Sequence, residues 1–531
     1  MKTFYTNGTI LTMEESALYA EAVCVKAGRI EAVGKKDEIM KFWEEGDELV
    51  DLKGATMLPG FIDGHSHFVG TANAMTQCDL SSAGSYDEII NLMREFKKKR
   101  NFSDEDWLVG CNYDHNFLAE SKHPTREVLD KISRTNPILL VHASSHMGVA
   151  NSRALEIQGI DENVQDRPDG RYGRETGTKI PNGYMEEKVF LEFQAGLPMT
   201  PVEKLMELIG EAQNLYASYG ITTVQDGMVG KTLFQLLKAA AELGILKLDI
   251  VGYLDIMTAA ELLEEEKKYA GQYEHHLKLG GYKIFLDGSP QGKTAWMQEP
   301  YEGEKEYRGY PIHSDEKLRE YIALSLDKGQ QLLAHCNGDA AAEQYISQFE
   351  KELEKREKKD SCRAVMVHAQ LVQKQQLERM ASLGMMPSFF VAHTYYWGDI
   401  HMKNFGAQRG SRISPAKDAM DCGLPFTFHQ DSPVVPPDMM RTVSSAVCRV
   451  SRTGQVIGKE QRIPVLEALK AITIYGAYQY HEEMEKGTIA KGKYADFVIL
   501  DKNPLETEES QLANVQVLRT VKENQTVYQK G

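Results

Sequence analysis

The sequence predicts an α/β protein whose main part is an eight-stranded (β/α)8 TIM barrel. Short apolar runs recur along the chain, each followed by a polar or glycine-containing turn, which is typical of buried parallel strands. Segments of helical periodicity separate most of these runs, and the alternation of strand with helix favours a closed barrel over a sandwich. In order, the eight runs are GFIDGHSHF, GITTVQD, LKLDIVGYLD, GGYKIFLDG, QQLLAHCNGD, RAVMVHAQ, MMPSFFVAH and PFTFHQDSP. The two ends of the chain have a different pattern.

Both chain ends predict antiparallel strands. Residues 3–34 and 487–528 alternate apolar with polar residues and contain glycine turns. Neither end has enough strands to form a stable sheet alone. We therefore expect residues 1–58 and 485–531 to pair into one small β-sandwich that flanks the barrel.

The barrel domain is expected to span residues 59–484 and to contain a long insertion. Residues 70 to about 200 separate the first apolar run from the second, which is too far for a single helix. A connection that follows a barrel strand emerges at the carboxyl-terminal mouth, where barrel enzymes have their active sites. We expect the inserted segment to shape the substrate pocket.

Composition excludes several classes of function. The chain has 531 residues, 42% of them hydrophobic and 26% charged, and a net charge of -16. An acidic chain without clustered Lys and Arg is a poor partner for nucleic acid. No apolar stretch is long enough to cross a bilayer, so we expect no membrane partner and a cytoplasmic location. The seven cysteines are widely spaced and contain no C-x-x-C pair, which fits reduced thiols.

The first apolar run ends in a pair of histidines, His65 and His67. Residues i and i+2 of a strand point to the same face, so both imidazoles would meet at the end of this strand. Imidazole is the commonest metal ligand in proteins, although an isolated pair is more often structural. The pair becomes informative together with polar residues at other strand ends.

Ionisable residues recur at the carboxyl ends of the predicted strands, which surround one mouth in a β/α barrel. The six candidate ligands are His65, His67, Lys283, His335, His368 and Asp431. Singly, each has a structural alternative: the histidines as core residues, Asp431 as a turn cap, and Lys283 as a partner of Asp287. Together, imidazoles and carboxylate oxygens suit divalent transition metals of the zinc, iron or manganese type. Such a metal generates hydroxide from bound water, and Asp431 could shuttle its proton, which indicates metal-assisted hydrolysis.

An ordered series of motifs covers nearly the whole chain, and its members are GRIEAVG, PGFIDGHSH, PILLVHASSHMGVANSRAL, GITTVQDG, KIFLDGS, HCNGDAA, VHAQLV, DSPV and GTIAKGKYADFVILD. With these motifs the chain resembles the amidohydrolase superfamily, and within it the amidohydrolase-3 branch that includes N-substituted formamide deformylase-like enzymes. The resemblance implies hydrolysis of a carbon–nitrogen bond in a small amide, such as an N-acyl, N-formyl or cyclic amide. By family analogy it also implies a homo-oligomer, namely a dimer.

The resemblance further implies how the ligands divide. His65, His67 and Asp431 would hold one metal ion, with zinc as the expected element, and His335 and His368 the other. Lys283 would be carboxylated and bridge the two ions, because a carbamate supplies anionic oxygens that an ammonium cannot. An unmodified Lys283 would leave a single ion per chain.

Further residues are candidates for contact with substrate. His393 ends the seventh run, where it could donate a hydrogen bond to the scissile carbonyl. In the insertion, His146 and Glu187 match polar positions of the branch, with Glu186 as the alternative to Glu187. The predicted aromatic lining of the pocket comprises Tyr395, Trp397 and Tyr113. Each of these residues could equally serve local packing.

The sequence departs from the family pattern before Asp431, where His429 and Gln430 replace glycine and serine. We expect Gln430 to alter packing rather than catalysis, because strand alternation points it away from the face of Asp431, whereas His429 could line the mouth. One alternative function is a mononuclear deaminase of the same superfamily, which would place a glutamate where this chain has Gly338. The other alternative is a hydrolase-like regulator without turnover, which would have lost a ligand, and this chain has lost none.

Overall fold

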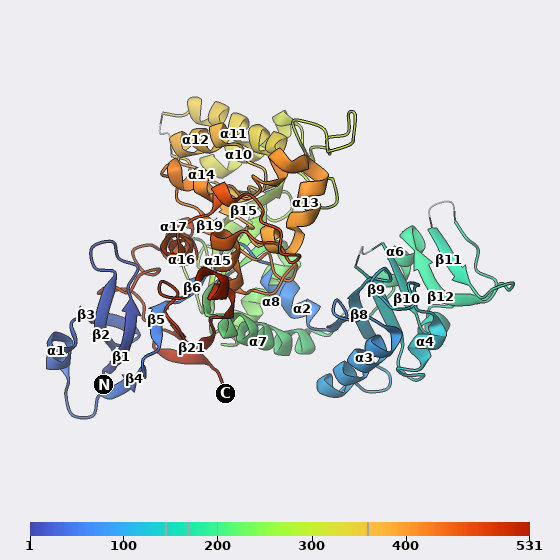
Figure 1. The fold of residues 1–531 in the computed structure, drawn as a ribbon, viewed down its shortest axis with the longest axis horizontal. Coiled ribbons are helices and arrows are strands. Elements are labelled where there is room, and N and C mark those ends of the chain that lie inside the picture. Colours follow the sequence, from blue (N-terminus) through green and yellow to red (C-terminus); the bar gives the residue numbers. More distant parts are fainter. Residues whose placement is uncertain (144–145, 168–169, 199, 358–359) are drawn as a thin grey trace. The chain divides into compact units, whose positions relative to one another are not determined.

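The computed structural model describes residues 1–531 except 144–145, 168–169, 199 and 358–359. The chain divides into two compact units, one of Met1–Thr71 with Ile209–Gly531 and one of Ala72–Leu208. Figure 1 shows both units in the colours of the sequence. In the described part of the chain, no helix combines the length and the apolar composition that crossing a membrane requires.

The larger unit contains a parallel eight-stranded sheet whose spatial order follows the chain order. Its strands are β6 (Phe61–Ile62), β13 (Ile221–Val229), β14 (Asp249–Asp255), β15 (Leu277–Phe285), β16 (Gln331–Cys336), β17 (Val365–His368), β18 (Met386–Phe389) and β19 (Thr427–Phe428). The amide of Gly64, just after β6, donates a hydrogen bond of 3.2 Å to the carbonyl of Phe428 in β19. This arrangement is a TIM-like α/β fold, and all eight predicted runs supply its strands.

Helices follow the barrel strands because their apolar residues recur at helical spacing. In α8, for example, Phe234, Leu237 and Ala241 form a buried stripe. The helices of this part are α8 (Lys231–Glu242), α9 (Leu262–Glu265), α10 (Asp315–Asp327), α11 (Asp339–Glu354), α12 (Lys374–Leu383), α13 (His393–Gly410), α14 (Ala416–Asp421), α15 (Met439–Cys448), α16 (Val465–Ala471) and α17 (Ile474–Gln479). Two further helices, α2 (Phe68–Ala74) and α7 (Val202–Ser218), span the two junctions between the units.

A second sheet joins the two chain ends, and its order is β22-β21-β20-β5-β1-β2-β3, with β4 beside β1. Its strands are β1 (Thr3–Leu11), β2 (Tyr19–Lys26), β3 (Arg29–Gly34), β4 (Glu48–Asp51), β5 (Thr56–Pro59), β20 (Phe497–Leu500), β21 (Val517–Lys522) and β22 (Gln525–Gln529), with helix α1 (Lys36–Ile39) after β3. Tyr5 and Phe497, from opposite chain ends, pack edge to face in its core. The ends therefore share one sheet, and its predicted division into two packed layers stays a prediction.

The smaller unit has a six-stranded sheet of its own, which the apolar pattern of the insertion does not predict. Its order is β11-β12-β10-β9-β8-β7, and β7, β8 and β9 run parallel. The strands are β7 (Gln77–Asp79), β8 (Leu108–Tyr113), β9 (Ile138–His142), β10 (Met147–Ala150), β11 (Gly170–Arg174) and β12 (Pro181–Glu186), and the helices are α3 (Tyr86–Arg100), α4 (Arg126–Asp130), α5 (Ser152–Ile157) and α6 (Glu187–Ala195). Ser85 starts α3 by accepting a hydrogen bond from the Glu88 amide, and Asn101 ends it in the left-handed region.

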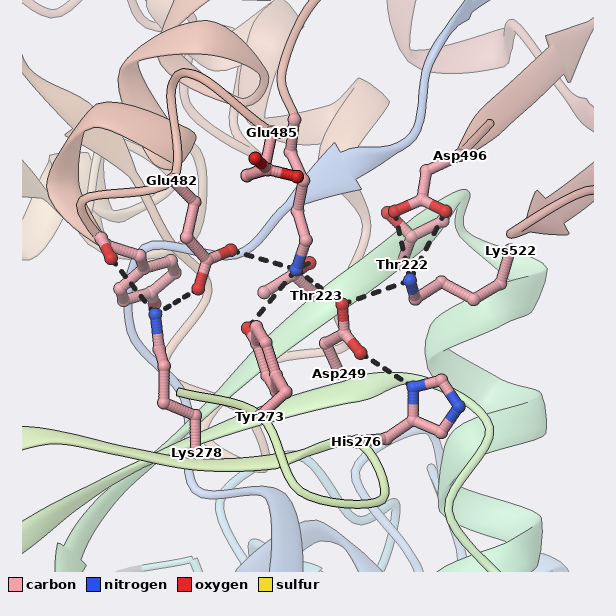
Figure 2. Close-up of polar contacts among 12 residues, drawn as sticks. Thr222, Thr223, Asp249, Tyr273, His276, Lys278, Glu482, Glu485, Asp496 and Lys522 are labelled. Carbon is pink, nitrogen blue, oxygen red and sulfur yellow. Dashed lines mark hydrogen bonds and ion pairs between the residues drawn. The ribbon is translucent and has the colours of Figure 1, made fainter. Parts of the chain in front are cut away.

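A cluster of buried charges connects the start of the barrel strands to the sheet that the two chain ends form, the end sheet (Figure 2). Asp249 is the first residue of β14, and its Oδ2 lies 3.1 Å from Lys522 Nζ of β21. Lys522 also pairs with Asp496 at 3.2 Å, and Asp249 pairs in addition with Lys486. His276 Nδ1 completes the surroundings of Asp249 at 2.7 Å. The predicted metal ligands lie near or after the carboxyl ends of barrel strands, so this cluster lies at the other end of the barrel.

Acid is expected to weaken this charge cluster. Burial alone would raise the pKa of Asp249, but the ammonium groups of Lys486 and Lys522 hold it well below its ordinary value. Because the folded-state pKa is depressed, the stabilisation is present above the unfolded value of about 3.9 and is lost as pH falls further. Urea unfolding at pH 2.5 to 7 should give a free energy of unfolding that falls less steeply below about pH 4 in Asp249→Asn than in wild type. Parallel curves for the two proteins would contradict this assignment.

Candidate metal centre

The six candidate ligands lie at one end of the barrel sheet. Three of them belong to barrel strands, and the other three follow the strands β6 and β19. His65 and His67 follow β6, and Asp431 follows β19. Lys283 is in β15, and the last two ligands, His335 and His368, are at or next to the ends of β16 and β17. Because parallel strands end at one edge, residues far apart in sequence become neighbours there.

The three ligands predicted for the first ion form a compact group. Oδ1 of Asp431 lies 3.3 Å from Nε2 of His65 and 3.3 Å from Nε2 of His67. The ring of His65 is oriented by Gln225, whose Oε1 is 2.5 Å from Nδ1. His67 Nδ1 lies 3.1 Å from the carbonyl of Gly227. Both histidines therefore use Nδ1 for contacts with the protein and present Nε2 to Asp431.

Lys283 lies beside this group and is fully buried. Its Nζ is 3.2 Å from Nε2 of His65. Burial lowers the pKa of Lys283 to about 7, against a partial opposing effect of the Asp431 carboxylate. A substantial share of the amine is therefore neutral near pH 7, and the neutral amine is the form that can react with carbon dioxide.

His335 and His368 form the second group, with ring centroids 4.5 Å apart. The ring of His368 is 5.8 Å from that of His65, so the two groups adjoin. His368 Nδ1 lies 3.1 Å from Nε2 of His429, and Nδ1 of His429 lies 2.8 Å from the Ser388 hydroxyl. His429, a candidate for lining the mouth, is fully buried and holds the ring of His368 in place.

The donor set fits a divalent transition metal. Oδ1 of Asp431 is buried and has no hydrogen-bond partner among the residues that the structure describes, whereas Nδ1 of His335 lies 3.3 Å from Oδ1 of the buried Asp287. Buried polar atoms without a partner are rare in native proteins, so the Asp431 oxygen calls for an explanation. Burial, together with neighbouring positive charge, lowers the pKa of His65 and of His368 well below the ordinary value. Both imidazoles are therefore neutral at pH 7, as metal ligation requires.

Two site residues were missed in the sequence, and both lie in β13. Gln225 orients His65, and its amide nitrogen also donates to the Gly64 carbonyl at 2.9 Å. Oδ2 of Asp226 accepts a hydrogen bond from the Val69 amide at 3.1 Å, and burial raises the pKa of Asp226 to about 7. A polar pair near the end of an apolar run, as in GITTVQD, was the signal that could have identified them.

His393 begins α13 and is buried beside a second histidine. Its Nδ1 lies 2.9 Å from Nε2 of His401, and the two rings are nearly parallel with centroids 5.2 Å apart. The ring of Trp397 packs 4.6 Å from that of His393. Tyr395 stacks under the guanidinium of Arg441 at 4.6 Å, and it is half-buried like Trp397. Their predicted contact with substrate stays a prediction.

The remaining predicted substrate residues belong to the smaller unit. His146 Nδ1 lies 3.2 Å from Oε2 of Glu187, and both side chains are exposed. Tyr113 is fully buried, and its hydroxyl lies 3.0 Å from Nδ1 of His123. Within this unit Tyr113 thus serves the core, and a role of these three residues in binding substrate stays a prediction.

Known proteins are similar to this chain in sequence and in fold. A family model described as the amidohydrolase family matches residues 48–528. YtcJ of Bacillus subtilis (strain 168) is 30% identical over 546 residues, which cover 100% of both chains. The N-substituted formamide deformylase of Arthrobacter pascens is 26% identical over 525 residues, 97% of this chain and 96% of that enzyme. The crystal structure of an uncharacterized metal-dependent hydrolase from Pyrococcus horikoshii OT3 aligns with a TM-score of 0.77 and 25% identity, covering 96% of this chain and 99% of that chain.

Proposed function

Because this chain belongs to the amidohydrolase family, we propose that it is a metal-dependent hydrolase of amide carbon–nitrogen bonds. N-formyl, N-acyl and cyclic amides are the proposed substrates, and the similarity to a formamide deformylase over nearly the whole chain supports this choice. The observation that carries the proposal is Oδ1 of Asp431, which lies between the imidazoles of His65 and His67 without a hydrogen-bond partner in the described part of the chain. These three side chains suit a bound cation, and the Asp431 carboxylate can also accept a proton beside it.

The residues are proposed to hold two metal ions, with zinc as the expected element. His65, His67 and Asp431 would hold one ion and His335 with His368 the other, bridged by a carbamate on Lys283. A bound transition metal lowers the pKa of its water toward neutrality, which supplies a nucleophile at neutral pH. The unpartnered Oδ1 of Asp431 and the neutral imidazoles of His65 and His368 support this assignment.

The protein residues have separate tasks in the proposed reaction. Asp431 would accept the proton that the attacking water loses and deliver it to the departing nitrogen, so that the amine leaves neutral. His393 would donate a hydrogen bond to the carbonyl oxygen as negative charge develops on it. Burial and the neighbouring His401 lower the pKa of His393 well below its ordinary value, so it acts as a neutral donor.

A deaminase of the same superfamily is less well supported. Position 338, where such an enzyme would place a glutamate, is Gly338, and the neighbouring carboxylate of Asp339 is occupied elsewhere. Its Oδ1 accepts a hydrogen bond from the Gln298 amide at 2.8 Å, and its Oδ2 accepts one from Gln373 at 2.8 Å. With both oxygens engaged, Asp339 is a weak candidate for the missing acid.

Removal of metal is expected to abolish hydrolysis, and its return should restore it. The protein would be treated with chelator, reloaded with zinc, manganese or cobalt, and assayed with N-formyl, N-acetyl and cyclic amides. Release of a carboxylic acid or ring opening is expected. Exocyclic amines of nucleobases serve as the comparison, because ammonia release from them would favour the deaminase. A metal-loaded protein that cleaves no amide in a broad panel, or turnover that survives complete chelation, would reject the proposal.

Substitution of Lys283 tests the bridging carbamate. We expect Lys283→Ala to lose metal from the barrel and to slow hydrolysis by about 10²-fold, as expected for misplaced reacting groups. Acetate or propionate should restore part of the metal content and part of the hydrolysis rate, because a small carboxylate can enter the space vacated by the side chain. Lys283→Met fills that space and should resist rescue, which makes it the matched control. Equal rescue of both variants, or wild-type metal content in both, would exclude a bridging role.

A further inference from the structure

A second group of possible ligands lies at one edge of the sheet in the smaller unit. Strands β8 and β9 are parallel neighbours, and Tyr113 pairs with His142 at their ends. Asp114 and His115 follow β8 directly, and His142 is the last residue of β9. Figure 1 shows β8 and β9 side by side. The register of the two strands therefore brings these three side chains to one point.

The distances among the three ligand atoms match those around a tetrahedral metal. Nδ1 of His115 is 3.2 Å from Nε2 of His142, and Oδ1 of Asp114 is 3.5 Å from His142 Nε2 and 3.8 Å from His115 Nδ1. Zinc bonds of about 2.0 to 2.1 Å at tetrahedral angles separate ligand atoms by about 3.3 to 3.4 Å. The three ligand atoms form a triangle, and a small contraction of its longer sides would accommodate one ion.

Neighbouring side chains hold two of the three groups, His115 and Asp114, in place. The ring of His123 stacks on that of His115 with centroids 3.9 Å apart. The backbone amide and side-chain amide of Asn116 both donate to Oδ1 of Asp114, at 2.9 and 2.8 Å. Ligands oriented by a second layer of contacts are typical of metal sites. One side of the group is open, because Asp114 and His115 are each 27% exposed whereas His142 is 8% exposed.

We propose that the smaller unit binds one divalent transition-metal ion through His115 Nδ1, His142 Nε2 and Asp114, with a remaining position open to solvent. Two imidazoles and one carboxylate select zinc-type ions over calcium and magnesium, which prefer oxygen ligands. The ion joins the end of β8 to the end of β9. This site goes beyond the proposed function and does not depend on it, because all of its ligands lie within the smaller unit.

The test compares zinc bound by the full-length protein and its variants after gel filtration, measured by plasma mass spectrometry. His115→Gln/His142→Gln should hold one ion fewer per chain than wild type, whatever the barrel holds. His275→Gln, which alters an exposed histidine beside Glu274, is the matched control and should keep the full content. Equal zinc content in the double variant and wild type would overturn the proposal and leave the His115–His142 contact as a hydrogen bond.

Hydrogen–deuterium exchange gives a local readout that is separate from activity. Zinc should slow exchange in the peptides that cover residues 108–116 and 138–143 of wild type, and it should leave them unchanged in the double variant. If the double variant fails to fold, Asp114→Asn keeps the size of the side chain and should weaken zinc binding about tenfold or more. Exchange that zinc does not affect in wild type would also reject the site. Failure of the amide-hydrolase proposal would instead appear in the activity assay and in the metal content of His65→Asn/His67→Asn.

Discussion

Replacement of Asp431 by asparagine is expected to lower kcat for amide hydrolysis by about 10³-fold, within the range of about 10² to 10⁴ that a lost proton-transfer group costs. The asparagine would keep the size of the side chain but could neither accept the proton nor supply an anionic oxygen between His65 and His67. The measurement is kcat and KM on the best amide of the substrate panel, with metal content determined on the same sample. KM should change much less than kcat, because the proton transfer belongs to the transition state.

The control for this experiment is Asp438→Asn, the same chemical change seven residues further on. The Asp438 side chain starts α15 by accepting a hydrogen bond from the Arg441 amide, a task that asparagine performs as well. This variant should therefore retain activity within a few-fold of wild type. If Asp431→Asn retained its metal and lost less than about tenfold in kcat, Asp431 could not be the proton shuttle.

The barrel was predictable because each of its strands carries its own local signal. A short apolar run with a polar residue at its carboxyl end identifies both a strand and a candidate site residue, as in the runs that end with His335 and His368. The fold then determines that such ends converge, which is why His65 and Lys283, far apart in sequence, lie with Nε2 and Nζ 3.2 Å apart. What these residues bind and catalyse stays a proposal.

Other features carry no such local signal. The sheet of the smaller unit contains strands as short as β7 (Gln77–Asp79), which apolar periodicity does not distinguish from loop. The contact of Lys486 with Asp249 joins residues from separate parts of the fold, and each of them has the sequence context of an ordinary surface charge. Pairing of distant polar groups depends on the packed structure, so it could be found only there. The buried position of His429 behind His368 is a further example.

Asp249→Asn is expected to destabilise the larger unit by about 3 to 5 kcal/mol, the cost of removing one partner from a buried group of charges. The side chains of Asp249, Lys486 and Lys522 are 4%, 3% and 2% exposed, so water cannot replace the lost carboxylate. Figure 2 shows Asp249 between Lys522 and His276. Asparagine carries no charge, so the buried ammonium groups of Lys486 and Lys522 would have less negative charge beside them. Urea unfolding at pH 7, followed by circular dichroism and tryptophan fluorescence, measures the change.

The same substitution at an exposed ion pair separates burial from charge as the cause. Asp327 pairs with Arg356 at 2.6 Å but is 67% exposed, so Asp327→Asn should cost less than about 1 kcal/mol. A loss confined to Asp249→Asn would show that the cluster stabilises the junction of the barrel and the end sheet, because Lys522 belongs to β21 and Asp249 to β14. Equal effects of the two substitutions would mean that the buried lysines lose their protons or reach water when the carboxylate is removed. In that case the cluster would contribute little to stability, despite its burial.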